Sequence, residues 1–269
     1  MNNKILPSFV LLLFSGLSFA ETAPALESNG QQLSPLTNVR VSMQRMLRSS
    51  EERYFLDLYA GVWNPKATLY DELNQTEMDF KGAQKGDVLE LKSVNMPEGK
   101  QSELKGYLNA NSGVFDAVLV NADGAKNVRF EPAFKAVDKP VFVFKFYGVE
   151  EAAQPYGKVL KRVDVVDKNT GKIKQSLTGF NAFANSVGYM DVNFDGYYDL
   201  VLSDISDAKK VEDKRFVYWM FNPKTMQFQR SAQLDALVGF PRLHGNKQQI
   251  DFGNNRLYRV RDGLMYLEP

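Results

Sequence analysis

The segment Asp191 to Asp199, DVNFDGYYD, carries the clearest chemical pattern in the chain. Oxygen-bearing side chains stand at its first, third, fifth and ninth positions, and a glycine stands at its sixth. Calcium takes about six to eight oxygen ligands, and a tight loop can turn alternate side chains inward toward the ion. The candidate ligands are the side chains of Asp191, Asn193, Asp195 and Asp199 and the backbone carbonyl of Tyr197.

Two alternatives to this calcium loop are an EF-hand and a turn without metal. An EF-hand would carry a bidentate glutamate at position 12, but that position is Leu202. The apolar run Leu200–Leu202 predicts a strand there, so we expect the loop between two β-strands, with Asp199 completing the coordination. The other alternative is an Asp- and Asn-rich turn that binds no ion. Because three carboxylates in one small loop repel one another, the sequence favours a calcium ion with a structural role.

Composition limits the other chemistry that the chain can perform. It has no cysteine and a single histidine, His244, which excludes cysteine nucleophiles, Cys-ligated metals and sites with two imidazoles. Ser186 within Ala184–Gly188 faintly resembles a nucleophile elbow that could use His244, but an elbow needs a helix after it and here the calcium loop comes next. We therefore predict no catalytic residue, no organic cofactor and no enzyme activity.

The N-terminus predicts export. Lys4 precedes a largely apolar run from Ile5 to Leu17, and small residues stand before a cleavage point after Ala20. A membrane anchor is the alternative, but the apolar run is shorter than the roughly 20 residues that span a bilayer. We expect a periplasmic protein without stable membrane insertion. The near balance of 33 Lys plus Arg against 32 Asp plus Glu gives it no electrostatic reason to bind nucleic acid.

The segment after the cleavage point is harder to interpret. Residues 21–35 are polar and aperiodic, which predicts a flexible tether. Between Leu36 and Glu52, the apolar residues Val39, Met43, Met46 and Leu47 have helical spacing, so a short helix is expected. Val39 to Met43 also alternates as a strand would, and this interpretation stays open.

From Arg53 onward the pattern is typical of β-structure. Short alternating runs are separated by glycine-containing turns every roughly 8 to 12 residues, which predicts an all-β protein with a sandwich, barrel or propeller-like array. We prefer a β-sandwich or propeller-like antiparallel sheets. The nearly continuous apolar run Val141–Tyr147 predicts a strand covered on both faces. The expected organisation is a signal peptide (1–20), a tether and possible helix (21–52), an N-terminal β region (53–135) and a C-terminal calcium-loop β domain (136–269).

The calcium loop and the segment after it resemble a known group of exported bacterial proteins. The loop leads to the strand Tyr218–Phe221, an Asn222-Pro-Lys-Thr225 turn and a strand ending in Phe228. This resembles FG-GAP-like calcium loops, and in particular the periplasmic immunity proteins that neutralise peptidoglycan-degrading effectors of antibacterial type IV secretion systems. Those proteins are similar in fold to inhibitors of invertebrate-type lysozyme. The resemblance is close over Asp191–Phe228 and loose elsewhere.

The resemblance implies a calcium-binding inhibitor whose partner is a peptidoglycan hydrolase or secreted antibacterial effector. A loop would enter the enzyme's substrate cleft, and calcium would hold that region rigid, which lowers the ordering cost of binding. The two candidate loops are Gly179–Gly188 and Ser203–Arg215. The candidate anchors are Phe180, Phe183, Tyr189, Tyr197 and Tyr198. The alternative is a calcium-stabilised envelope binding or structural module without inhibitory activity.

Overall fold

The computed structural model describes residues 32–61, 64–96, 101–152, 157–205 and 210–268. The predicted signal peptide and most of the predicted tether therefore lie outside the described residues. Within them the chain is almost entirely β-strand, with one short 3-10 helix, η2 (Val211–Asp213), and one short α-helix, α1 (Ala232–Asp235). The all-β prediction is confirmed. No helix in the described ranges combines the length and apolar character needed to cross a membrane.

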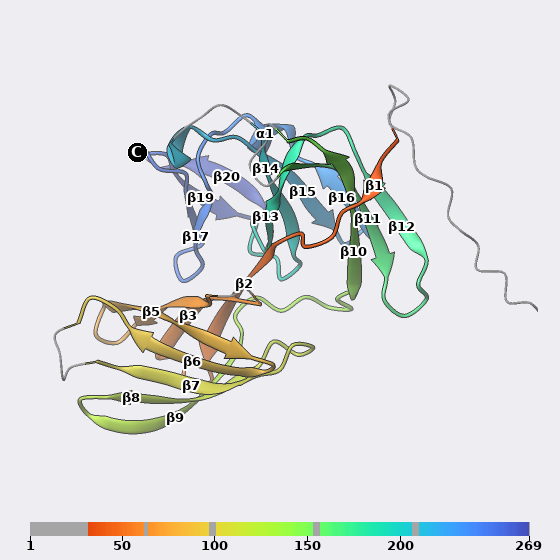
Figure 1. Ribbon diagram of the computed structural model, residues 1–269. Helices are drawn as coiled ribbons and strands as arrows, with labels where there is room; N and C mark the ends of the chain where they lie inside the picture. Colours follow the sequence, from red (N-terminus) through yellow and green to blue (C-terminus); the bar gives the residue numbers. More distant parts are fainter. Residues whose placement is uncertain (1–31, 62–63, 97–100, 153–156, 206–209, 269) are drawn as a thin grey trace, which may run out of the picture.

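Eight consecutive strands form a closed up-and-down barrel, drawn in orange to green in Figure 1. They are β2 (Val41–Ser49), β3 (Tyr54–Ala60), β4 (Lys66–Asp71), β5 (Thr76–Lys85), β6 (Val88–Ser93), β7 (Glu103–Leu108), β8 (Phe115–Asn121) and β9 (Gly124–Pro132). Each strand pairs antiparallel with the next, and pairing of β9 with β2 closes the ring. Side chains such as Leu58, Leu91 and Phe115 fill the interior, as expected for a barrel of this size.

Strand β2 corrects the expected N-terminal helix. The residues Val41 to Ser49 are a strand because one of their faces enters the barrel, where Leu47 is buried, and the other packs on the rest of the molecule through Met46. A strand covered on both faces has neighbouring apolar residues, and this produced the helix-like spacing. The end of the predicted tether is also held in place, because β1 (Ser34–Pro35) pairs with β10 (Phe142–Glu150).

The second half of the chain forms two further groups of strands above the barrel in Figure 1. The first is β1, β10, β11 (Lys158–Asp167), β12 (Ile173–Leu177), β13 (Ala182–Met190), β14 (Asp199–Asp204), β15 (Phe216–Asn222) and β16 (Gln227–Arg230). The second is a separate antiparallel sheet of β17 (Arg242–His244), β18 (Gln249–Asp251), β19 (Leu257–Arg261) and β20 (Leu264–Leu267). The run Val141–Tyr147 differs from expectation, since Val141 and Val143 are exposed while Phe142 and Phe144 pack inward.

Strand pairing, a shared apolar core and a covalent linker join the barrel to the rest of the molecule. Strand β2 continues past the barrel and pairs in parallel with β13, with Val41 opposite Val187. The barrel side chains Met46 and Phe55 also share one apolar core with residues of β14, β15 and the C-terminal sheet. The chain leaves β9 through residues 133–141, hereafter the linker, which lies at the expected domain boundary. The barrel and the second half therefore meet along a packed interface.

Candidate metal centre

The predicted calcium loop lies where the sequence placed it, between two antiparallel strands. Strand β13 ends at Met190, β14 begins at Asp199, and these two residues are opposite each other in the ladder. Gly196 has a φ of 88°, in the left-handed region that favours glycine. A Cβ atom at this position would stand 2.6 Å from the backbone nitrogen of Ala136. The glycine is needed both for the turn and for close packing against the linker.

Asp191, at the first position of the loop, is buried, with 3% of its surface exposed. Its Oδ1 accepts a hydrogen bond from the backbone N–H of Asp195 at 3.0 Å, and its Oδ2 accepts one from Gly196 at 2.8 Å. Burial, followed by repulsion from the Asp195 carboxylate, raises the pKa of Asp191 to about 7. A carboxylate in this setting gains from a nearby cation.

Asp199, at the ninth position, is fully buried and ties the loop to the neighbouring strand. Its Oδ2 accepts from the backbone N–H of Val192 and its Oδ1 from that of Phe221 in β15, both at 2.8 Å. Burial is the main cause that raises its pKa well above the usual range, and repulsion from Asp191 adds to it. The side chain therefore has a clear structural role in addition to its predicted role as a ligand.

Asn193 and Asp195 face each other inside the loop. The Asn193 Nδ2 donates to the Oδ2 of Asp195 at 2.8 Å, and the Oδ1 of Asp195 accepts from the backbone N–H of Tyr197 at 2.9 Å. The remaining amide oxygen, Asn193 Oδ1, is buried and has no hydrogen-bond partner among the described residues. A buried acceptor without a partner is costly, and a bound cation would satisfy it. The loop thus offers the oxygen ligands that calcium prefers, and one of them, Asn193 Oδ1, has no other partner among the described residues.

The carboxylates are not gathered into a ready-made ligand cluster. In the part of the chain that the structure describes, no three or more His, Cys, Asp or Glu side chains form a group that could hold a metal ion. The oxygens of Asp191 and Asp199 point instead at backbone N–H groups, and those of Asp195 at the Tyr197 backbone and the Asn193 amide. The predicted residues therefore lie in one loop, and the carboxylate oxygens of Asp191, Asp195 and Asp199 already accept hydrogen bonds within the protein.

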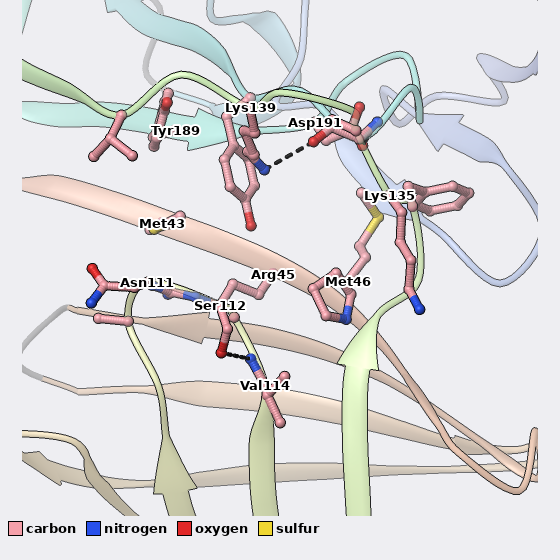
Figure 2. A pocket seen from close by; sticks show the side chains of 18 of the residues that line it. Met43, Arg45, Met46, Asn111, Ser112, Val114, Lys135, Lys139, Tyr189 and Asp191 are labelled. Carbon is pink, nitrogen blue, oxygen red and sulfur yellow. Dashed lines mark hydrogen bonds between the residues drawn. The ribbon is translucent and has the colours of Figure 1, made fainter. Parts of the chain in front are cut away.

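The linker packs directly against the loop. Lys139 donates to the carbonyl of Gly196 at 2.9 Å, and its ammonium lies 3.6 Å from the ring centre of Tyr198. Part of the Lys139 side chain is exposed, yet desolvation lowers the pKa of its ammonium to about 8. The Tyr197 hydroxyl donates to the carbonyl of Val137 at 2.5 Å. Figure 2 shows Lys139 close to Asp191. The loop thus fastens the linker, and through it the barrel, to the second half.

The aromatic residues expected as partner anchors are packed instead. Phe180 is buried in the core of the second half, where the rings of Tyr189 and Tyr197 also pack. Tyr198 lies against Tyr189, with 4.9 Å between ring centres. Phe183 is half-buried. The first candidate loop, Gly179–Gly188, is mostly strand β13, so it cannot project into another protein as a free loop.

The serine considered as a nucleophile also lies in a strand. Ser186 is an exposed residue within β13 and is followed by the calcium loop, so the strand-to-helix turn of an elbow does not form around it. His244 is half-buried in β17, and this burial lowers its pKa.

Two cationic residues near the loop were not singled out from the sequence. Lys139 comes from the linker and Arg45 from β2, both far from the calcium motif in the chain. The sequence does contain a pattern that could have pointed to Arg45. In a strand, this charged residue lies on the same face as the apolar residues Met43 and Leu47 and between them. Neither a known family model nor any curated protein matches this chain.

Proposed function

We propose that this chain is an exported calcium-binding protein that inhibits a peptidoglycan-degrading hydrolase. The calcium part of the proposal rests on one observation, the buried Oδ1 of Asn193, which has no partner among the described residues and lies in a loop with regularly spaced oxygen donors. The ligands would be the side chains of Asp191, Asn193, Asp195 and Asp199 and the carbonyl of Tyr197. The ion would neutralise carboxylates that burial otherwise pushes toward protonation.

The position of the loop suggests what calcium does for the protein. The loop contacts the linker through Lys139 and Tyr197 and reaches β15 through Asp199. An ion bound there stiffens the junction between the barrel and the second half without taking part in any reaction. Stiffening a binding protein in its bound form raises affinity because less ordering is left for the moment of binding.

Inhibition is supported by the resemblance of Asp191–Phe228 to immunity proteins, and this segment is one continuous structural unit. The calcium loop, β14, β15 and β16 come one after another, and the strands are antiparallel neighbours. The Asn222–Thr225 turn joins the last two strands, and the Asn222 side chain accepts from the backbone N–H of Lys224 at 2.9 Å. A rigid unit of this kind would suit a protein that inhibits an enzyme by occupying its substrate cleft.

Contact with the hydrolase would use surfaces other than the packed aromatic residues. The connection between β14 and β15 is the remaining candidate loop, and its residues Lys210, Glu212 and Asp213 are exposed. These charged side chains would set partner choice and association rate more than affinity.

The alternative function is an envelope binding or structural module that uses calcium only for stability. It is favoured by the fact that the loop's side chains contact the protein's own backbone and linker. Under this alternative the protein binds calcium but leaves peptidoglycan hydrolysis unchanged.

An inhibition assay separates the two functions. The mature chain, residues 21–269, is added to lysozyme-like and amidase-type hydrolases acting on purified peptidoglycan, with calcium or with chelator. We expect one hydrolase class to be inhibited, and more strongly with calcium. The Asp191→Ala, Asp195→Ala double variant should lose that calcium dependence, while Asp123→Ala, which removes an acid from an exposed barrel turn, should not. Calcium binding without inhibition of any hydrolase would reject the inhibitor and favour the module.

A further inference from the structure

A cavity of about 630 Å³ lies at one mouth of the barrel. It forms where β2 changes neighbours: over Leu47–Ser49 this strand pairs with β9, and over Val41–Met43 it pairs with β13. Since these two neighbours leave β2 in different directions, a space opens between them. Residues 110–114 of the β7–β8 loop, the linker and the calcium loop complete its walls, as Figure 2 shows. Barrel mouths and domain junctions are common places for small-molecule sites.

Arg45 lines this cavity from strand β2. It is opposite Leu58 in the ladder, so its side chain shares the barrel's inner face with that core residue. Only 7% of Arg45 is exposed. Within the described ranges it makes no side-chain hydrogen bond or ion pair with another residue. A guanidinium keeps its proton in proteins, and a buried charge without a counter-charge is unfavourable, so the fold alone does not explain this residue.

A second cation lines the same cavity. The ammonium of Lys139 donates to the carbonyl of Gly196 and lies over the ring of Tyr198, and it makes no direct ion pair within the described ranges. The carboxylates of Asp191, Asp195 and Asp199 balance part of its charge through space. Figure 2 shows Lys139 and Arg45 reaching this space from the linker and from β2. The two positive groups come from segments far apart in the sequence and meet only at this junction.

The acids that line the cavity are already engaged. Glu131 forms an ion pair with Lys135, 2.9 Å between Nζ and Oε2. Asp191 accepts backbone N–H groups from Asp195 and Gly196 with both of its oxygens. Among the described residues, the cavity therefore keeps one guanidinium without an acidic partner, that of Arg45, and a second cation, Lys139, whose charge the loop carboxylates balance only in part.

The remaining walls of the cavity would suit the organic part of a ligand that carries an anionic group. Asn111 and Ser112 provide polar groups on the β7–β8 loop, and Tyr189, Phe134 and Phe142 provide aromatic surface. The volume lies within the range of roughly 300–1,000 Å³ that is usual for small-ligand sites. The planar fork of an arginine matches the two oxygens of a carboxylate or phosphate.

We propose that this cavity binds a small organic anion, with its carboxylate or phosphate group on Arg45 and Lys139 and its apolar body against the aromatic wall. This binding site is distinct from hydrolase inhibition and does not depend on it.

Titration calorimetry and thermal melting of the mature chain at saturating calcium test this site with three probes that share a short alkyl chain and differ in their polar group. Hexanoate and hexyl phosphate carry the two anionic groups, and hexanamide is the neutral control. We expect at least one anion to bind at least about tenfold more tightly than the amide, because a buried charge pair is lost without the anion. The anion that binds better distinguishes a carboxylate ligand from a phosphate ester.

Variants assign the binding to Arg45. Arg45→Met should remove the preference for the anion and raise the melting temperature in anion-free buffer, because it deletes an unpaired buried charge. Lys135→Gln is the matched control, since it removes a cation of the same cavity that already has Glu131 as its partner. If Arg45→Met does not fold, Lys139→Gln provides the second test. Equal binding of anions and amide, or an unchanged preference in the folded variant, would overturn the proposal.

Discussion

Replacing Asp57 by asparagine should change how the stability of the protein depends on pH. Asp57 lies on β3, faces out of the barrel toward the second half, and is 7% exposed. Gln44 Nε2 donates to its Oδ1 at 2.6 Å. Burial raises the pKa of Asp57 to about 7, although the hydrogen bond from Gln44 and the charge of Lys66 lower it in part. The ordinary pKa of an aspartate carboxyl, which serves as the value for the unfolded chain, is 3.8.

The sign depends on which state holds the proton more tightly. The folded protein binds the Asp57 proton more strongly than the unfolded chain, so the contribution of Asp57 to stability is fully present below pH 4 and is lost as the pH rises to about 7. The interval between the two pKa values, at about 1.4 kcal/mol per pH unit, corresponds to roughly 4 kcal/mol. Asparagine stays neutral throughout, and its amide N–H can meet Gln44 Oε1, which has no partner among the described residues.

Urea unfolding of the wild type and Asp57→Asn from pH 4 to pH 8, at one saturating calcium concentration, measures this difference. We expect similar stabilities at pH 4 and a variant that is more stable by up to roughly 4 kcal/mol at pH 8. The matched control is Asp79→Asn, which removes an exposed acid on the neighbouring side of the barrel and so gives the same change in formal charge. Parallel wild-type and Asp57→Asn curves over this range would refute the reasoning.

Three further substitutions test the packing of the loop and the barrel by denaturant unfolding. Gly196→Ala should cost about 1–3 kcal/mol and more than Gly263→Ala, because both have a positive φ but only the first would clash with the linker; equal losses would contradict this packing. Asp199→Asn should destabilise even in chelator by about 1–3 kcal/mol, because one of two buried backbone N–H groups loses its acceptor; a cost seen only with calcium would contradict it. Phe115→Ala should cost about 3–5 kcal/mol because the side chain is fully buried in the barrel, whereas the exposed Val118→Ala should change little.

The all-β class could be predicted because it depends on local patterns. Alternating runs and glycine turns are properties of a few neighbouring residues. Closure of the barrel depends on the pairing of Leu47 with Pro132, which are far apart in the chain, and no local pattern reports it. The same long-range contacts bury β2 on both faces and made Met43, Met46 and Leu47 look helical.

The position of the loop Asp191–Asp199 between two strands could be predicted from sequence because its residues are consecutive. Its surroundings could not, since Lys139, Val137 and Ala136 reach the loop from the linker. Tyr197 was expected to be available to a partner, but its hydroxyl and ring are engaged inside the protein. Sequence alone does not reveal whether an aromatic side chain in a loop faces the solvent or a neighbouring segment.

Calorimetric titration of calcium into the mature chain tests the central claim, that Asp191–Asp199 binds this ion. We expect one site with a dissociation constant of roughly 0.1 to 1 mM, as is common for extracellular calcium modules. At free calcium about 100 times that constant, binding should add roughly 2.7 kcal/mol to the free energy of unfolding and raise the melting temperature. The Asp191→Ala, Asp195→Ala variant should show neither effect. No heat of binding and identical melting of the wild type in calcium and in chelator would contradict the claim.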